Sequence, residues 1–234
     1  MLDIEDVALV MLPERFGEMV ALKQLNLSSC SLEELPESIG QLADLRELLL
    51  EDNRIALLPC TFGQLVALER LNLSWNRALQ ELPSNFGQLV ALRRLDLESC
   101  GLQTLPETVG QLHNLLILNL VGNLLTSLPA SFGQLAALMV QDVQSNKLAE
   151  LPETFGGLAS VTALNLSQNG LLRLPDSFGC LAALHALNIR SNPLVDVPAT
   201  LGQLAAMRYV TVDRGLAGFF YQMPGVVSVE ILDA

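Results

Sequence analysis

The side chains that most often carry catalysis are sparse in this 234-residue chain and form no recognisable motif. His113 and His185 are its two histidines, and neither belongs to a nucleophile or metal-ligand pattern, so both are interpreted as ordinary surface residues. The glycines recur periodically, and no G-x-x-x-x-G-K-[ST] or G-x-G-x-x-G loop stands in the context that nucleotide binding requires. We therefore expect no catalytic residues, no cofactor and no enzymatic activity.

Cysteines could supply disulfides or zinc ligands, but their spacing here argues against both. The four cysteines form no C-x-x-C pair, and each stands where equivalent segments of the chain carry other residues: Cys30, Cys60, Cys100 and Cys180. No metal site is expected.

A repeat accounts for most of the sequence. A Leu-Pro pair returns every 23 residues, with one interval of 24 whose extra residue lies around Arg77-Ala78, directly after Asn76. The pairs are Leu12-Pro13, Leu35-Pro36, Leu58-Pro59, Leu82-Pro83, Leu105-Pro106, Leu128-Pro129, Leu151-Pro152 and Leu174-Pro175, and Val197-Pro198 is a ninth variant.

Each repeat divides into a strand half and a turn half. In the L-x-L segments, such as Leu25 to Leu27, one intervening residue places both leucines on the same side of a short strand. Proline after leucine suits the first turn of a helix, so the other half should form short helical turns. Strands stack about 4.8 Å apart and helices roughly 8–10 Å apart, so the stack should curve with its strands inside.

A column of polar residues follows the strands where the chain must turn. An amide at this position can bond to backbone groups of adjacent coils, and a thiol is a weaker substitute. The column, interpreted as a structural ladder, is Cys30, Asn53, Asn76, Cys100, Asn123, Asn146, Asn169 and Asn192.

These L-x-x-L-x-L-x-x-N/C-x-L runs resemble the leucine-rich-repeat family over nearly the whole chain. The resemblance implies an α/β solenoid: a right-handed, curved horseshoe with a parallel concave sheet and short helical or 3-10 turns on the convex side. The 23-residue unit looks like that of the intracellular Ras-group and Scribble-like proteins and of similar bacterial arrays. Those families imply scaffold or adaptor roles in the cytoplasm and in signal transduction.

We expect one domain over residues 1–234, with a truncated first repeat (1–12), about nine repeats (13–212) and a C-terminal cap (213–234). Leu2 and Ile4 match strand positions, so no polar cap precedes them; we expect missing repeats, a partner or a second copy to cover this edge. In the cap, Val227, Val229 and Ile231 predict a last strand, and Phe219 and Phe220 are expected to close the core.

The composition narrows the partners. A net charge of −12 disfavours nucleic acid and anionic membranes. Polar residues interrupt every apolar segment before it reaches the length of a spanning helix, and the first residues lack the features of a signal peptide. We therefore expect a cytoplasmic chain that binds protein and does not insert into membranes.

The binding surface is predicted on the concave face. The middle strand positions carry a mostly Asn/Asp row, interpreted as structural, whereas the flanking positions vary. The early repeats are charged and the middle repeats turn apolar there. The predicted site has an apolar part, Trp75, Leu116, Ile117, Val121, Met139 and Val140, and a charged flank, Arg70, Arg93 and Arg94. The alternative is that these residues merely tolerate exposure.

Gln141 departs from the repeat because it occupies a position that is leucine in most units. Two outcomes are open. Its amide forms hydrogen bonds within the core, or the strand shifts register and turns Met139 or Val140 inward.

The sequence favours a protein-interaction module, a scaffold or adaptor that binds its partner on the concave face. Two alternatives remain. The array could be the substrate-recognition part of a larger enzyme, such as a ubiquitin ligase, kinase or GTPase, or a permanent subunit of a large assembly.

Overall fold

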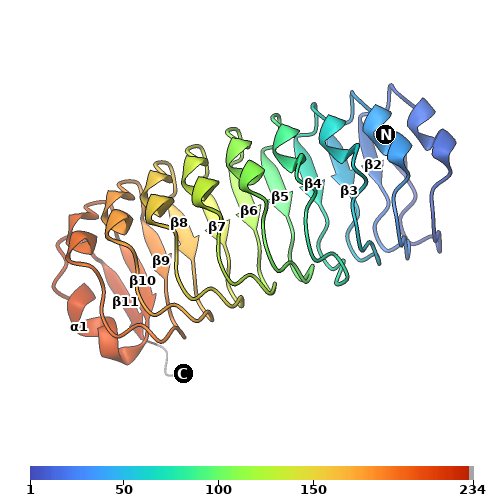
Figure 1. Cartoon of the computed structure of the whole chain (residues 1–234). Helices are drawn as coiled ribbons and strands as arrows, with labels where there is room; N and C mark the ends of the chain where they lie inside the picture. The colour runs from blue at the N-terminus through green and yellow to red at the C-terminus, as the bar shows by residue number, and fades with distance from the viewer. Residues whose placement is uncertain (232–234) are drawn as a thin grey trace.

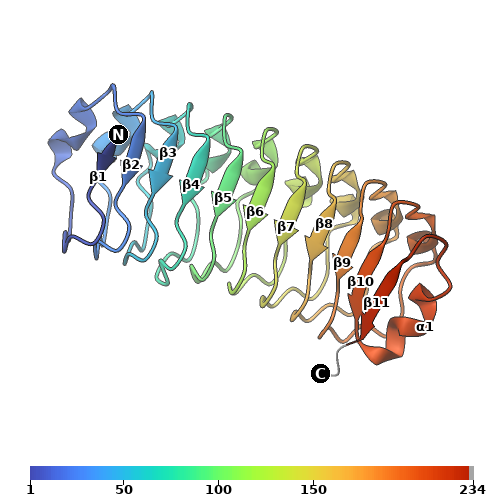
Figure 2. The same cartoon turned by 180° about the vertical axis from the view of Figure 1, so that it is seen from behind.

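The computed structural model describes residues 1–231, which form a stack of coils in chain order, with β1 near one end of the stack and β11 at the other (Figure 1). All the strands lie on one side and the short turns on the other (Figure 2). Among the described residues, eleven strands form one parallel sheet. Each strand pairs with the strands that precede and follow it in the sequence. The predicted curved solenoid is confirmed.

The sheet register follows the repeat. Leu25 pairs with Leu48, and Leu48 with Leu71, so equivalent residues of successive coils lie side by side. The strands are β1 (Leu2–Asp3), β2 (Gln24–Asn26), β3 (Glu47–Leu49), β4 (Arg70–Asn72), β5 (Arg94–Asp96), β6 (Ile117–Asn119), β7 (Val140–Asp142), β8 (Ala163–Asn165), β9 (Ala186–Asn188), β10 (Tyr209–Val212) and β11 (Ser228–Ile231).

The turn half of most repeats is a single 3-10 turn. It begins directly after the proline that recurs in each repeat, as at Pro36. Glycine in this turn allows close packing: a Cβ on Gly40 would lie 2.6 Å from the carbonyl oxygen of Thr61 in the next coil. The 3-10 helices are η1 (Glu14–Glu18), η2 (Glu37–Gln41), η3 (Phe62–Gln64), η4 (Phe86–Gln88), η5 (Glu107–Gln111), η6 (Ala130–Gln134), η7 (Glu153–Gly157), η8 (Asp176–Cys180), η9 (Ala199–Gln203) and η10 (Arg214–Leu216).

The core is a continuous row of leucines between the sheet and the turns. Leu48, Leu71 and their equivalents are fully buried between neighbouring coils. Phenylalanines of the turns stack in parallel from coil to coil, with ring centroids 6.2 Å apart for Phe132 and Phe155. Because each fully buried side chain of this size contributes about 1.5–3 kcal/mol, this row supplies most of the driving force for folding.

The polar ladder bonds one coil to the next. The amide of Asn123 donates to the carbonyl oxygens of Leu97 (2.7 Å) and Leu120 (3.0 Å), and its oxygen accepts from the backbone N–H of Leu102 (3.0 Å). Asn53, Asn76, Asn146, Asn169 and Asn192 repeat this arrangement.

The two cysteines in the ladder supply a hydrogen-bond donor in place of the asparagine amide, but they have no amide oxygen to act as the acceptor. The thiol of Cys100 donates to the carbonyl oxygen of Leu73 at 3.1 Å, and burial raises the pKa of this thiol to about 12. It offers no amide oxygen to the N–H of Leu79, which instead bonds to the carbonyl oxygen of Asn76 at 2.9 Å. The loop that makes this bond contains the extra residue of the 24-residue repeat, so the insertion compensates for the missing acceptor.

We expect Asn123→Ala to lower the free energy of unfolding by about 1–3 kcal/mol for each buried backbone group left without a partner. Urea denaturation followed by circular dichroism measures the loss. Asn114→Ala is the matched control because the exposed amide of Asn114 makes one hydrogen bond, to the carbonyl oxygen of Val90. Equal losses in the two variants would contradict a structural ladder.

Gln141 follows neither outcome left open by the sequence. It pairs in register with Leu118 and Leu164, so the strand is not shifted. Its side chain is buried, at 1% exposure, and neither amide atom has a hydrogen-bond partner among the described residues. Both expectations, an internal hydrogen bond and a register shift, are therefore wrong: the leucines of the adjoining coils hold the register and offer the amide nothing to bond.

An unsatisfied buried amide costs about 1–3 kcal/mol, so Gln141→Leu should raise the melting temperature by roughly 2–4 °C per kcal/mol recovered. Differential scanning calorimetry measures the change. Gln103→Leu, a replacement of an exposed glutamine, is the control and should change little. A lower melting temperature for Gln141→Leu would show that the amide is satisfied in solution.

At the C-terminal end, β11 pairs in parallel with β10, as the alternation of Val229 and Ile231 predicted. The short helix α1 (Ala217–Phe220) covers the last coil, with Phe220 fully buried and Phe219 packed against the core at its edge. Residues 232–234 of the expected cap lie outside the described residues. Among residues 1–231, no helix combines the length and the apolar character needed to cross a bilayer.

Candidate functional site

The concave face of the sheet presents rows of side chains that the core does not use. The first residue of each strand begins such a row, and the register places these residues next to one another across the sheet. From β2 to β10 the row reads Gln24, Glu47, Arg70, Arg94, Ile117, Val140, Ala163, Ala186 and Tyr209. It changes from charged to apolar between Arg94 and Ile117.

At the charged end, the arginines are matched with carboxylates. Arg70 Nη1 lies 2.8 Å from Glu47 Oε1, and Arg46 Nη1 lies 2.6 Å from Glu69 Oε1. These pairs are well exposed to solvent, so each contributes at most about 1 kcal/mol to folding. These ion pairs partly neutralise the predicted charged flank before any partner binds.

Arg94 is held more firmly than the other arginines. Its Nε and Nη2 atoms donate to the two carboxylate oxygens of Asp96, at 2.7 and 3.2 Å. The hydrogen bond to Asp96 raises the pKa of Arg94 above its ordinary value. Arg93, the third residue of the predicted flank, is exposed.

The middle of the sheet carries the predicted apolar residues on adjacent strands. Ile117 pairs with Val140, and the backbone N–H of Met139 bonds to the carbonyl oxygen of Leu116 at 2.9 Å. Met139 and Val140 are 46% and 42% exposed, whereas Leu116, Ile117 and Val121 are half-buried. Side chains of this type on neighbouring strands form a continuous apolar surface.

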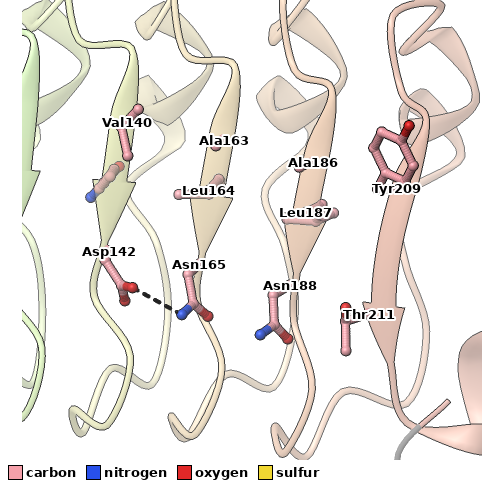
Figure 3. Close-up of a pocket in the computed structure, with 11 residues that line it drawn as sticks. Val140, Asp142, Ala163, Leu164, Asn165, Ala186, Leu187, Asn188, Tyr209 and Thr211 are labelled. Atoms are coloured by element: carbon pink, nitrogen blue, oxygen red, sulfur yellow. Dashed lines mark hydrogen bonds between the residues drawn. The ribbon is translucent and has the colours of Figure 1, made fainter. Parts of the chain in front are cut away.

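This surface leads into a hollow of about 270 Å³ over β7 to β10. Figure 3 shows Val140 and Tyr209 at its two sides, with the small side chains of Ala163 and Ala186 between them. A polar row runs along one edge of the hollow, where Asn165 Nδ2 donates to Asp142 Oδ2 at 3.0 Å. Tyr209 is 57% exposed, so an aromatic ring is available at the end of the apolar surface.

A second hollow, of about 650 Å³, lies on the sheet face at the carboxyl ends of β1 to β4. Its lining is different in character because it combines three carboxylates with two large apolar side chains. The residues that line it are Glu5, Asn26, Ser28, Ser29, Leu49, Glu51, Asp52, Arg70, Asn72 and Trp75.

The structure brings some of the predicted site residues together and separates others. Ile117 and Val140 begin the adjacent strands β6 and β7, and Leu116 and Met139 directly precede them. Trp75 instead follows β4 and lines the second hollow. Tyr209, Ala163 and Ala186 were not predicted; the signal for them was the change to small residues at the first strand position in two consecutive repeats.

In the described part of the chain, no three His, Cys, Asp or Glu side chains cluster closely enough to hold a metal ion. The four cysteines are free thiols.

Three family models match the sequence. The model described as a leucine-rich repeat region matches residues 82–166, a second leucine-rich-repeat model matches 142–194, and a third matches 21–42 and 67–89. The chain belongs to the leucine-rich-repeat family. A search of curated protein sequences found no match.

Several solved structures share the fold. A leucine-rich-repeat protein of Leptospira interrogans is 28% identical, with a TM-score of 0.58 over 90% of this chain and 67% of its own. Toll of Drosophila, in its glycosylated complex with Spätzle, is 24% identical, with a TM-score of 0.84 over 99% of this chain. The ectodomain of the Arabidopsis thaliana receptor kinase GASSHO1/SCHENGEN3, in complex with CASPARIAN STRIP INTEGRITY FACTOR 2, is 23% identical, with a TM-score of 0.68 over all of this chain. This chain spans 34% of the length of the matched chain in the Toll complex and in the GASSHO1/SCHENGEN3 complex.

Proposed function

We propose that this chain is a non-catalytic module that binds a protein partner on its concave sheet face, as a scaffold or adaptor. The observation that carries the proposal is the apolar surface formed by Ile117, Met139 and Val140, which continues into the hollow beside Tyr209. Leucines inside the coils already supply the core, so these exposed side chains are not needed for folding. Exposed apolar groups on neighbouring strands characterise interaction sites.

The similar structures support a binding role of this kind. Toll and the plant receptor kinase ectodomain were solved as complexes, with Spätzle and with CASPARIAN STRIP INTEGRITY FACTOR 2. Both complexes use a scaffold of the same fold. Leucine-rich-repeat families typically act through binding, and we propose the same for this chain.

We propose a cytoplasmic location for the module. Four free cysteines, two buried and two exposed, suit a reducing compartment, because oxidising compartments favour disulfides in secreted proteins. In this location the net charge of −12 would keep the chain away from nucleic acid and favour protein partners with basic or apolar surfaces.

Ile117→Asp together with Met139→Asp should weaken partner binding by about a hundredfold, since two charges would have to be buried against an apolar surface. Affinity purification with quantitative mass spectrometry identifies the partner, and the dissociation constant is then measured with the purified pair. Circular dichroism should show unchanged folding.

Val66→Asp together with Val90→Asp is the matched control. Both valines are about half exposed, at 50% and 52%, and lie beside the convex turns. The control therefore adds the same two negative charges as the Ile117/Met139 variant, but on the opposite face. The control should bind the partner as the unaltered chain does. Full binding by the Ile117/Met139 variant would contradict the proposed face.

A further inference from the structure

The second hollow, at the carboxyl ends of β1 to β4, has an excess of negative charge. Three carboxylates line it, from Glu5, Glu51 and Asp52. The one cation in its lining, Arg70, is paired with Glu47 outside the hollow at 2.8 Å. Its charge is therefore already compensated, and the three carboxylates keep theirs.

The carboxylates also keep hydrogen-bonding capacity. Glu5 Oε2 accepts from the amide of Asn26 at 3.3 Å, and Glu51 Oε2 accepts from the amide of Asn72 at 2.8 Å. The other carboxylate oxygen of each glutamate, and both carboxylate oxygens of Asp52, have no hydrogen-bond partner in the described part of the chain. Neutral amide donors orient a carboxylate but leave its charge available to a cation.

Two large apolar side chains, Leu49 and Trp75, also line this hollow. Leu49 is the last residue of β3, where it pairs with Asn26 and Asn72 of the neighbouring strands and interrupts the polar row. Trp75 follows β4 and is 37% exposed. The lining thus combines carboxylates and amides with two apolar side chains.

Trp75 occupies an unfavourable backbone position. Its φ angle is 65°, in a column where the other coils place Asp, Ser, Gln or Gly at a similar positive φ. The left-handed conformation costs roughly 1–2 kcal/mol for a residue with a bulky side chain. The ring is partly exposed, and the guanidinium of Arg77 lies 5.3 Å from its centroid, so the ring already contacts a cation.

We propose that this hollow binds a lysine or arginine side chain from a basic segment of the protein partner. The methylene groups of that side chain would lie against Leu49 and Trp75, and its charged end would lie among Glu5, Glu51 and Asp52. Long cationic side chains combine an apolar stem with a charged head in this way, and a tryptophan ring attracts cations. Within residues 1–231, no group of three or more His, Cys, Asp or Glu side chains could hold a metal ion.

This inference rests on the proposed function because it describes part of the same partner's contact with the concave face. It assigns the partner two kinds of contact: a basic side chain at β1 to β4 and an apolar segment over β6 to β10. The net charge of −12 adds long-range attraction for such a basic segment.

Trp75 provides a direct readout because it is the single tryptophan of the chain. Purified chain is titrated at low salt with N-acetylated, C-amidated tetralysine or tetraarginine while tryptophan fluorescence is recorded. We expect a saturable change in intensity or wavelength with at least one of the two peptides. The same peptide with every lysine ε-acetylated removes the charge and should give no change.

The variant that tests the carboxylates is Glu51→Gln together with Asp52→Asn. Asparagine tolerates the positive φ of residue 52, 53°, so the backbone should remain as it is. We expect binding of the cationic peptide to weaken by about tenfold, equivalent to about 1.4 kcal/mol. Glu33→Gln together with Glu34→Gln is the control, since it removes the same charge from two exposed carboxylates outside the hollow.

Two outcomes would overturn the inference. The first is the absence of a saturable fluorescence change with both tetralysine and tetraarginine. The second is an equal loss in the Glu33/Glu34 control, which would mean that the peptide responds only to total charge. The proposed function is tested separately, because the Ile117/Met139 variant leaves the hollow intact and its partner binding is measured without the cationic peptide.

Discussion

The structure depends on one constraint: no coil can bury its own leucines, and each is covered only by the coils on either side. A coil of 23 residues has one short strand and one 3-10 turn, which are too few to enclose a core. Stacking provides the missing cover and merges the separate leucines into one row. Since all of this apolar burial lies between the sheet and the turns, the hydrophobic core makes no use of the side chains that point out of the concave face.

The irregular positions show how strictly the stack limits variation. Where Cys100 replaces asparagine, a donor remains and an acceptor is lost, and a one-residue insertion in the adjoining loop supplies another acceptor from the backbone. Gln141 has no such compensation, yet its strand keeps the common register because Leu118 and Leu164 hold the neighbouring coils in place. Packing along the row therefore outweighs the cost of one unsatisfied amide.

The concave face carries different kinds of side chain at its two ends. Near the N-terminal end, ion pairs and unpaired carboxylates surround Leu49 and Trp75, whereas from β6 onward the face becomes apolar and ends at Tyr209. A rigid sheet keeps these two surfaces at a fixed separation. A partner that matches both would be selected by two independent kinds of contact, charge at one end and apolar area at the other.

The sequence by itself determined the repeat, the parallel register, the alternation of strands and turns, and the leucine core, because a fixed period forces equivalent residues into the same environment in every coil. It also indicated where the concave face turns from charged to apolar. Only the tertiary structure decided which side chains share a hollow: it placed Trp75 with Glu5 and Glu51, away from Met139, and joined Val140 to Tyr209. It also decided that Gln141 is buried without a partner. The physical reason is that a repeat fixes where each backbone position lies, whereas the contacts of an exposed side chain depend on its size, its rotamer and its neighbours two or three coils away.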